Sequence, residues 1–146
     1  MSATAVAKKL GGKRVLRREV TSELELAEVV RAGLPSSALD FVLAELAKSA
    51  GSQAAVYSVV GRARTLQRKR TEHTDLSLDE SDRLARLARL LVRAEEALGD
   101  DEKARRWLSR PNRALGGHAP LTLLDSDAGA LAVERVLGRI EHGVYS

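Results

Sequence analysis

The residues with the clearest chemistry lie in a short basic segment, 62–70, which carries five lysines and arginines and no acid. Another short segment, 52–60, precedes it, and Gly61 separates the two. Arginine can form two parallel hydrogen bonds with the edge of guanine, and lysine or arginine can neutralise a backbone phosphate. Two short helices joined by a glycine turn, the second of them basic, are typical of a helix-turn-helix that binds DNA. The alternative is that the basic segment is an ordinary solvated helix face.

Helical geometry divides the basic segment into two sides. Ala63 and Leu66 fall on one side, where they would face a core, and the polar and basic side chains project from the other. The residues expected to contact DNA are Arg62, Arg64, Thr65, Gln67, Arg68 and Lys69.

Catalysis has no comparable support in the sequence. The histidines are His73, His118 and His142, and none has a metal-ligand type of residue three or four positions after it. Cysteine is absent, and no G-x-S-x-G, H-E-x-x-H or phosphate-loop motif occurs. We therefore expect a protein that is not an enzyme and that holds no metal ion and no cofactor.

Composition points to helices as the elements that position these residues. The chain has 146 residues, of which 44% are hydrophobic but only 3% aromatic, so leucine, valine and alanine must build the core. The scarcity of Tyr, Phe, Trp, Ile and Thr favours helix over sheet. The length suits one domain, or two small helical modules that share a core.

Positive charge is concentrated in the first half of the chain. Residues 1–75 hold 13 Lys/Arg and 8 Asp/Glu, whereas residues 76–146 hold 11 and 12. Nucleic acid is the obvious anionic partner for the basic half, and improved solubility is the alternative.

Hydrophobic spacing and helix-start signals predict an all-α fold of five to eight helices without a sheet. The longest helix is expected at about 77–98, where Ser77 and Glu80 match a capping box and leucines recur along one stripe. The other expected caps are Ser22, Ser36 or Ser37, Ser52, Asp100 and Ser126.

Residues 1–20 are expected to form a flexible basic arm. They contain six lysines and arginines and a single acid, so contact with phosphate and a merely frayed terminus are both open. Lys8 and Lys9 are not followed by the roughly 7–15-residue apolar stretch of a signal peptide, and no apolar run approaches the ~20 residues that span a bilayer. We therefore expect a cytoplasmic protein that does not enter a membrane.

Two aromatic positions in the second half are candidates for contacts. Trp107 can anchor a core or lie at an interface. After a glycine, the sequence ends in Val144, Tyr145 and Ser146, and this apolar end either docks on the body of the protein or is reserved for a partner.

The second half also resembles a known family. The positions that carry the resemblance are Trp107-Leu108, 111–117 (PNRALGG), Pro120-Leu121, Leu124, Ala128-Gly129, Val133, 137–140 (LGRI) and 143–146 (GVYS). They are similar to the toxin-binding domain of Xre/MbcA/ParS-type antitoxins. In the first half, Arg64-Thr65-Leu66, Arg68, Leu76-Ser77 and 80–84 resemble the Xre-like helical domain that precedes it in this family. The similarity runs from about Leu24 to Ser146 and does not cover residues 1–20.

With the basic arm at 1–20, the resemblance divides the chain into an Xre-like helix-turn-helix domain at 21–92 and a toxin-binding domain at 93–146. It implies a cognate RES-domain toxin, akin to ADP-ribosyltransferases, that consumes NAD or uses it to modify a target. The antitoxin would cover the toxin's active-site cleft, partly with its C-terminal segment. It would also self-associate, as a homodimer, and repress its own operon by binding operator DNA. The residues expected at the toxin interface are Trp107, Arg110, Asn112, Arg113, Arg139, Val144, Tyr145 and Ser146.

Two other functions stay open at this point. A stand-alone dimeric helix-turn-helix repressor would use its C-terminal half only to dimerise; a lone regulator gene would favour it, whereas an adjacent RES-type gene favours the antitoxin. A small basic helical scaffold would bind DNA without sequence preference and would have no protein partner.

Overall fold

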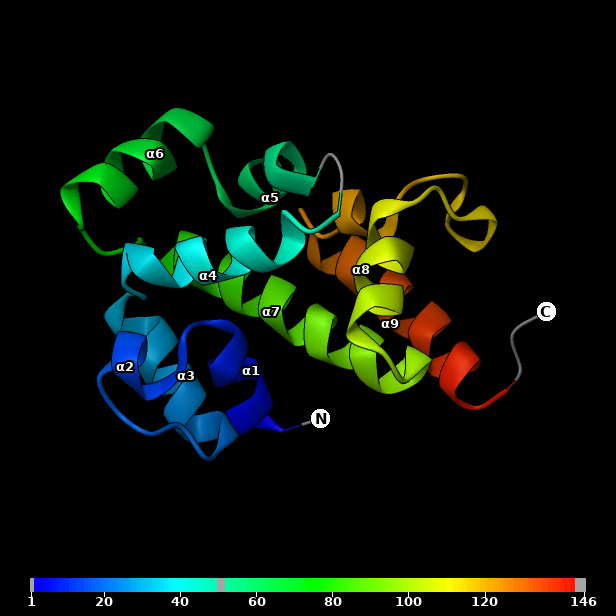
Figure 1. The fold of residues 1–146 in the computed structure, drawn as a ribbon, viewed down its shortest axis with the longest axis horizontal. Helices are drawn as coiled ribbons and strands as arrows, with labels where there is room; N and C mark the ends of the chain where they lie inside the picture. Colours follow the sequence, from blue (N-terminus) through cyan, green and yellow to red (C-terminus); the bar gives the residue numbers. More distant parts are fainter. Residues whose placement is uncertain (1, 50–51, 144–146) are drawn as a thin grey trace.

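The structure is a computed structural model that describes residues 2–49 and 52–143. Within these residues the fold is helical, with nine α-helices, two short 3₁₀-helices and no strand, so the all-α prediction is confirmed (Figure 1). The elements are α1 (Ala3–Lys9), α2 (Gly12–Leu16), α3 (Glu23–Ala32), α4 (Ser36–Leu46), α5 (Ser52–Val60), α6 (Ala63–Glu72), α7 (Leu78–Leu98), α8 (Asp101–Ser109), η1 (Arg113–Leu115), η2 (Pro120–Leu123) and α9 (Asp127–Glu141).

The long helix α7 is the centre of the fold. It packs against α1, α3 and α5 from the first half and against α8 and α9 from the second (Figure 1). Leu84, Leu87 and Leu91, which recur at helical spacing, are fully buried in its apolar stripe. The two domains expected at 21–92 and 93–146 therefore meet within one continuous helix and share one core.

Four of the nine α-helices in the described residues begin at a side-chain cap that the sequence predicts. The expected caps that accept a hydrogen bond from a backbone amide three residues later are Ser22, Ser77, Asp100 and Ser126. Ser77 and Glu80 form the complete capping box at the start of α7. The starting residue of each of these helices depends on hydrogen bonds within one helical turn, so it can be predicted from the sequence.

The cap expected from Ser36 or Ser37 is wrong. Pro35 is the N-cap of α4 and provides no side-chain hydrogen bond. Ser36 is buried, and its Oγ donates instead to the Lys69 carbonyl oxygen of α6, 3.0 Å away. The hydroxyl thus joins two helices that are far apart in sequence.

Residues 2–20 do not form the expected flexible arm. They fold into α1 and α2, and α1 packs on α3, α4 and α7. Ala3, Val6, Ala7 and Leu10, spaced as one helix face, are all buried. The sequence does not reveal this helix clearly, because its apolar face is short, is built partly of alanine, and is surrounded by basic residues and a glycine pair. These two additional helices bring the α-helices of the described chain above the expected number.

Lys9 fixes α1 to the body of the protein. Its Nζ donates to Glu45 Oε1 of α4 at 2.9 Å and also to Glu95 of α7. Burial disfavours the charged form of Lys9, but the hydrogen bonds to Glu95 and Glu45 outweigh it and raise its pKa above 10.5. One lysine of the supposed arm is therefore a structural contact between three helices.

The second half closes around the end of α7. Gly129 lies in the first turn of α9, where a Cβ atom would come within 1.8 Å of the Leu123 carbonyl oxygen. Only glycine allows α9 to start this close to η2.

No helix within the described residues combines the length and the apolar character needed to span a membrane.

Candidate functional site

The first candidate site is the helix pair α5 and α6. Val56, Val59 and Val60 on α5 and Leu66 on α6 are buried, which holds both helices against the core. Gly61 turns the chain between them, and a Cβ atom there would lie 3.3 Å from Glu80 Cγ. The pair therefore has the two short helices and the tight glycine turn expected of a helix-turn-helix.

Lys69 holds the inner side of α6 to α7. Its Nζ donates to Glu80 Oε1 at 2.6 Å, and the two side chains are only 16% and 13% exposed. Burial alone would raise the pKa of Glu80, but the hydrogen bonds from Lys69 and from the Ser77 amide lower it below 4.5. Lys69 was expected to project toward DNA; the structure places it against α7 because the capping carboxylate of Glu80 lies within its reach.

Arg70 holds α6 to α4 and α5. It donates to the Asp40 carboxylate of α4 and to the Tyr57 hydroxyl oxygen of α5. Burial disfavours its charge, but these two hydrogen bonds outweigh that cost and raise its pKa. Together with the Lys69–Glu80 pair and the bond from Ser36 to the Lys69 carbonyl, these contacts fix the orientation of the helix.

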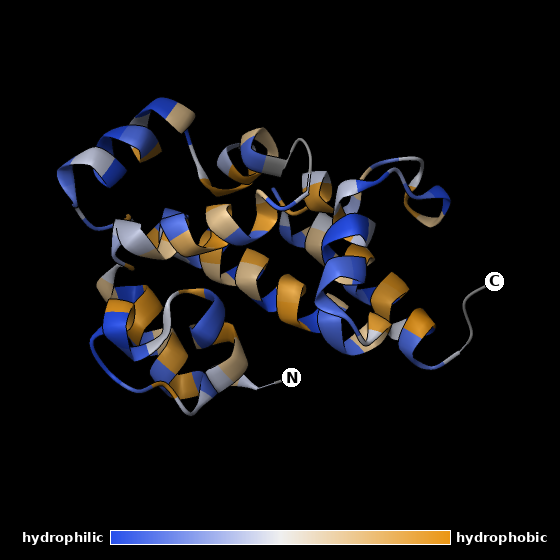
Figure 2. Ribbon diagram, viewed as in Figure 1, coloured by the Kyte–Doolittle hydropathy of each residue, from blue (hydrophilic) through white to orange (hydrophobic). Residues whose placement is uncertain are grey.

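The outer side of α6 remains exposed. Figure 1 shows α6 at an edge of the molecule, and Figure 2 shows that it is largely hydrophilic. Arg62 and Arg64 form no ion pair among the described residues, and Arg68 makes only a weak contact of 3.5 Å with Glu72. The exposed side chains of the predicted set are Arg62, Arg64, Gln67 and Arg68, while Thr65 is half-buried. This arrangement suits a helix that enters the major groove of DNA.

The second candidate site is a groove beside α8. It has a volume of about 530 Å³, and the residues that line it are Leu98, Lys103, Arg106, Trp107, Arg110, Pro111, Asn112 and Arg113. Four of the predicted toxin-contacting residues, Trp107, Arg110, Asn112 and Arg113, thus come together. Leu98, Lys103 and Arg106 were not anticipated, although the spacing of 103, 106, 107 and 110 marks one face of a helix. We call this feature the Trp107 groove.

Asn112 is less accessible than the other groove residues, and the predicted contact residues outside the groove are placed differently. Asn112 is 8% exposed, and its Oδ1 accepts a hydrogen bond from the Ala114 amide at 2.9 Å, so it shapes the loop after α8. Arg139 is exposed on α9 and does not line the Trp107 groove. Val144, Tyr145 and Ser146 lie outside the described residues.

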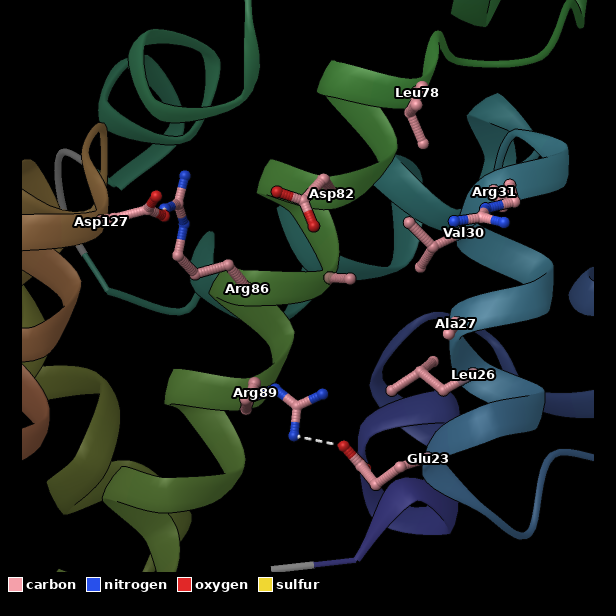
Figure 3. A pocket seen from close by; sticks show the side chains of 11 residues that line it. Glu23, Leu26, Ala27, Val30, Arg31, Leu78, Asp82, Arg86, Arg89 and Asp127 are labelled. Carbon is pink, nitrogen blue, oxygen red and sulfur yellow. Dashed lines mark hydrogen bonds and ion pairs between the residues drawn. The ribbon is translucent and has the colours of Figure 1, made fainter.

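A further hollow of about 450 Å³ lies between α3 and α7 and reaches the start of α9 (Figure 3). Arg89 of α7 pairs with Glu23 of α3 at 2.8 Å, and Arg86 pairs with Asp127 of α9. These opposite charges connect α7 to its neighbours on both sides.

The described residues contain no group of three or more His, Asp or Glu that could hold a metal ion.

The fold defines a helix-turn-helix protein with two modules. The first module presents the basic helix α6 after the Gly61 turn, and the second packs on the other end of α7. Comparison with family models agrees. Residues 25–89 match the antitoxin Xre-like helix-turn-helix domain, and residues 93–143 match the antitoxin Xre/MbcA/ParS C-terminal toxin-binding domain. The chain belongs to the antitoxin Xre family.

Known relatives support this assignment. An antitoxin Xre from Photorhabdus laumondii is 34% identical over 129 residues, which are 83% of this chain and 81% of the relative. One from Yersinia enterocolitica is 41% identical over 85 residues, 58% of this chain, and the match spans 57% of that relative's length. A Prs ADP-ribosylating antitoxin from Sphingobium sp. is 31% identical over 91 residues, 56% of this chain and 57% of the relative.

Proposed function

We propose that this protein is an antitoxin that binds and neutralises a cognate toxin through its C-terminal module and binds operator DNA through α6. The observation that carries the proposal is that both family modules occur on one helical body, with an exposed basic α6 in the first and an open groove in the second. The protein itself is not an enzyme in this scheme, and it acts in the cytoplasm, where toxin and operon meet.

The toxin is a RES-domain protein that consumes NAD or transfers ADP-ribose. The resemblance to Xre/MbcA/ParS-type antitoxins supports this identity, and so does a relative whose name is Prs ADP-ribosylating antitoxin. Inhibition occurs by covering the toxin's active-site cleft. Trp107, Arg110 and Arg113 contribute from the groove and Asn112 holds their loop, while Arg139 adds a contact from α9 and Val144, Tyr145 and Ser146 act as a terminal plug.

DNA binding uses the exposed side of α6. Arg64 and Arg68 contact base edges, Arg62 and Gln67 contact the backbone or neighbouring bases, and Thr65 packs at the rim. Lys69 orients α6 rather than contacting DNA. The active form in this proposal is a homodimer, because a dimeric helix-turn-helix protein reads two half-sites; its α6 helices then lie ~34 Å apart.

Co-expression with the product of the adjacent gene tests the proposal. The toxin alone should arrest growth and lower cellular NAD or label a protein with ADP-ribose, and the antitoxin should abolish both effects and co-purify with the toxin. A toxin gene that remains harmful in the presence of the antitoxin would contradict the assignment. Specific operator binding without any protein partner would instead support a stand-alone dimeric repressor, and sequence-independent DNA binding without a partner would support a basic scaffold.

A further inference from the structure

The Trp107 groove has an unbalanced charge. Lys103, Arg106, Arg110 and Arg113 line it, and no aspartate or glutamate does. Of these four, Arg106 alone has an ion-pair partner in the part of the chain that the structure describes: Glu102, at 2.5 Å, one turn earlier on α8. The other three cations are exposed and form no ion pair among the described residues. An occupant of the groove must therefore supply negative charge.

The same groove also offers an apolar surface. Leu98 and Trp107 are partly buried and pack on the core, so one face of each is available beside Pro111. Tryptophan and arginine are the residues most often found at the energetic centres of protein interfaces. An aromatic ring flanked by arginines suits a peptide segment that presents an apolar side chain between carboxylates.

The groove is separate from the exposed side of α6, and its apolar lining does not suit DNA. The α6 helix is held at the start of α7 through Glu80, whereas the groove begins at Leu98, the last residue of α7. At 1.5 Å per residue these points are about 27 Å apart along the helix. Leucine, proline and indole side chains also have no complementary surface on a DNA phosphate backbone.

We infer that the Trp107 groove receives an acidic segment of the toxin, in which carboxylates bind Arg110, Arg113 and Lys103 and an apolar side chain packs on the Trp107 indole. This inference rests on the proposed function, because it takes the toxin as the partner. It goes further by specifying the chemistry of the toxin surface that docks there. The Arg106–Glu102 pair leaves that arginine as the least available of the four cations.

The test measures binding between the purified chain and the purified product of the adjacent gene. The double variant Arg110→Glu/Arg113→Glu should raise Kd roughly 100-fold, because two desolvated charge pairs become repulsive. Lys13→Glu/Arg14→Glu makes the same change in net charge on the exposed side of α2 and should leave Kd within about twofold. Binding by the parent should weaken as salt rises, and the Arg110/Arg113 variant should lose that dependence.

Fluorine NMR reports on the apolar half of the site. Trp107 is the only tryptophan in the chain, so 5-fluorotryptophan labels this position alone, and an unlabelled toxin adds no signal. The resonance should shift when the toxin binds, and Trp107→Phe should weaken binding less than the double arginine reversal does. Circular dichroism of each variant confirms that the helices are retained.

Each outcome has a defined meaning. If the parent binds no toxin, the proposed function fails, and this inference fails with it. A normal complex with an unchanged Kd for Arg110→Glu/Arg113→Glu, or with an unmoved fluorine resonance, overturns the inference and leaves the proposed function intact. Loss of binding to a scrambled DNA duplex by this variant, with toxin binding unaffected, would assign the groove to nucleic acid and also overturn it.

Discussion

The contact between Lys69 and Glu80 gives the sharpest test of how α6 is presented to DNA. A lysine on a recognition helix would ordinarily be assigned to a phosphate, but here its side chain is 16% exposed and bound to α7. Exposed ion pairs contribute under ~1 kcal/mol, and removal of one partner from a fully buried pair costs about 3–5 kcal/mol. With side chains 16% and 13% exposed, Lys69→Met and Glu80→Gln should each lower the free energy of unfolding by about 2 kcal/mol. Glutamine retains the capping box with Ser77, so Glu80→Gln isolates the ion pair from the cap.

DNA binding distinguishes an orienting lysine from a phosphate contact. If Lys69 bound a phosphate, Lys69→Met would reduce the slope of log K against log salt by about 0.9, and Glu80→Gln would not. If Lys69 orients α6, both variants should weaken operator binding to a similar extent and leave the slope unchanged. The assays are urea denaturation followed by circular dichroism and operator titrations at several salt concentrations. A lower slope for Lys69→Met, with unchanged stability, would refute the reasoning.

The pH dependence follows from the same pair. The pKa of Glu80 is lowered in the folded protein, so its contribution to stability is fully present above about pH 4.5, the value of the unfolded state. It is lost as the pH falls through the lower folded pKa. Glu80→Gln should therefore remove part of the acid sensitivity of the parent protein.

Four further outcomes test other parts of the molecule. Arg64→Ala or Arg68→Ala should weaken specific operator binding by about 1–3 kcal/mol each, and unchanged binding by the double variant would refute their assignment to the major groove. Deletion of residues 143–146 should leave a toxin complex that has regained NAD consumption, and complete inhibition at matched occupancy would exclude a terminal plug. Leu10→Ala, at the fully buried C-cap of α1, should lower the free energy of unfolding by about 2–5 kcal/mol, whereas a flexible arm would show no effect. Hydrogen bonds from the Thr21 amide and hydroxyl lower the pKa of Glu25 to about 2, so its contribution to stability is present above about pH 4.5 and is lost as the pH falls to about 2. Glu25→Gln should therefore be less stable than the parent at neutral pH and should lose less stability between pH 4.5 and pH 2, as measured by acid titration of the helical signal.

The features that could be predicted from the sequence are those decided within one or two helical turns. Ser77 and Glu80 mark the start of α7 because both hydrogen bonds of the capping box join residues three apart. The leucines of α7 are buried because their spacing places them on one stripe. The two helices around Gly61 follow from the same local rules, and the family resemblance of the second half follows from residue identities at set spacing.

Contacts between distant residues were decided only by the tertiary structure. Lys9 meets Glu45 and Glu95, which are 36 and 86 positions away, so a residue of the expected arm joins α1 to α4 and α7. Lys69, which the sequence predicts as a DNA contact, pairs with Glu80 because α7 brings that carboxylate within its reach. The Trp107 groove is lined by Lys103 and Arg106, which the sequence did not mark as contacts, whereas Arg139 lies outside it on α9. Local patterns determine which segments are helices, but the free energy of burying one face against another, and of pairing charges across that contact, depends on neighbours that only the folded chain provides.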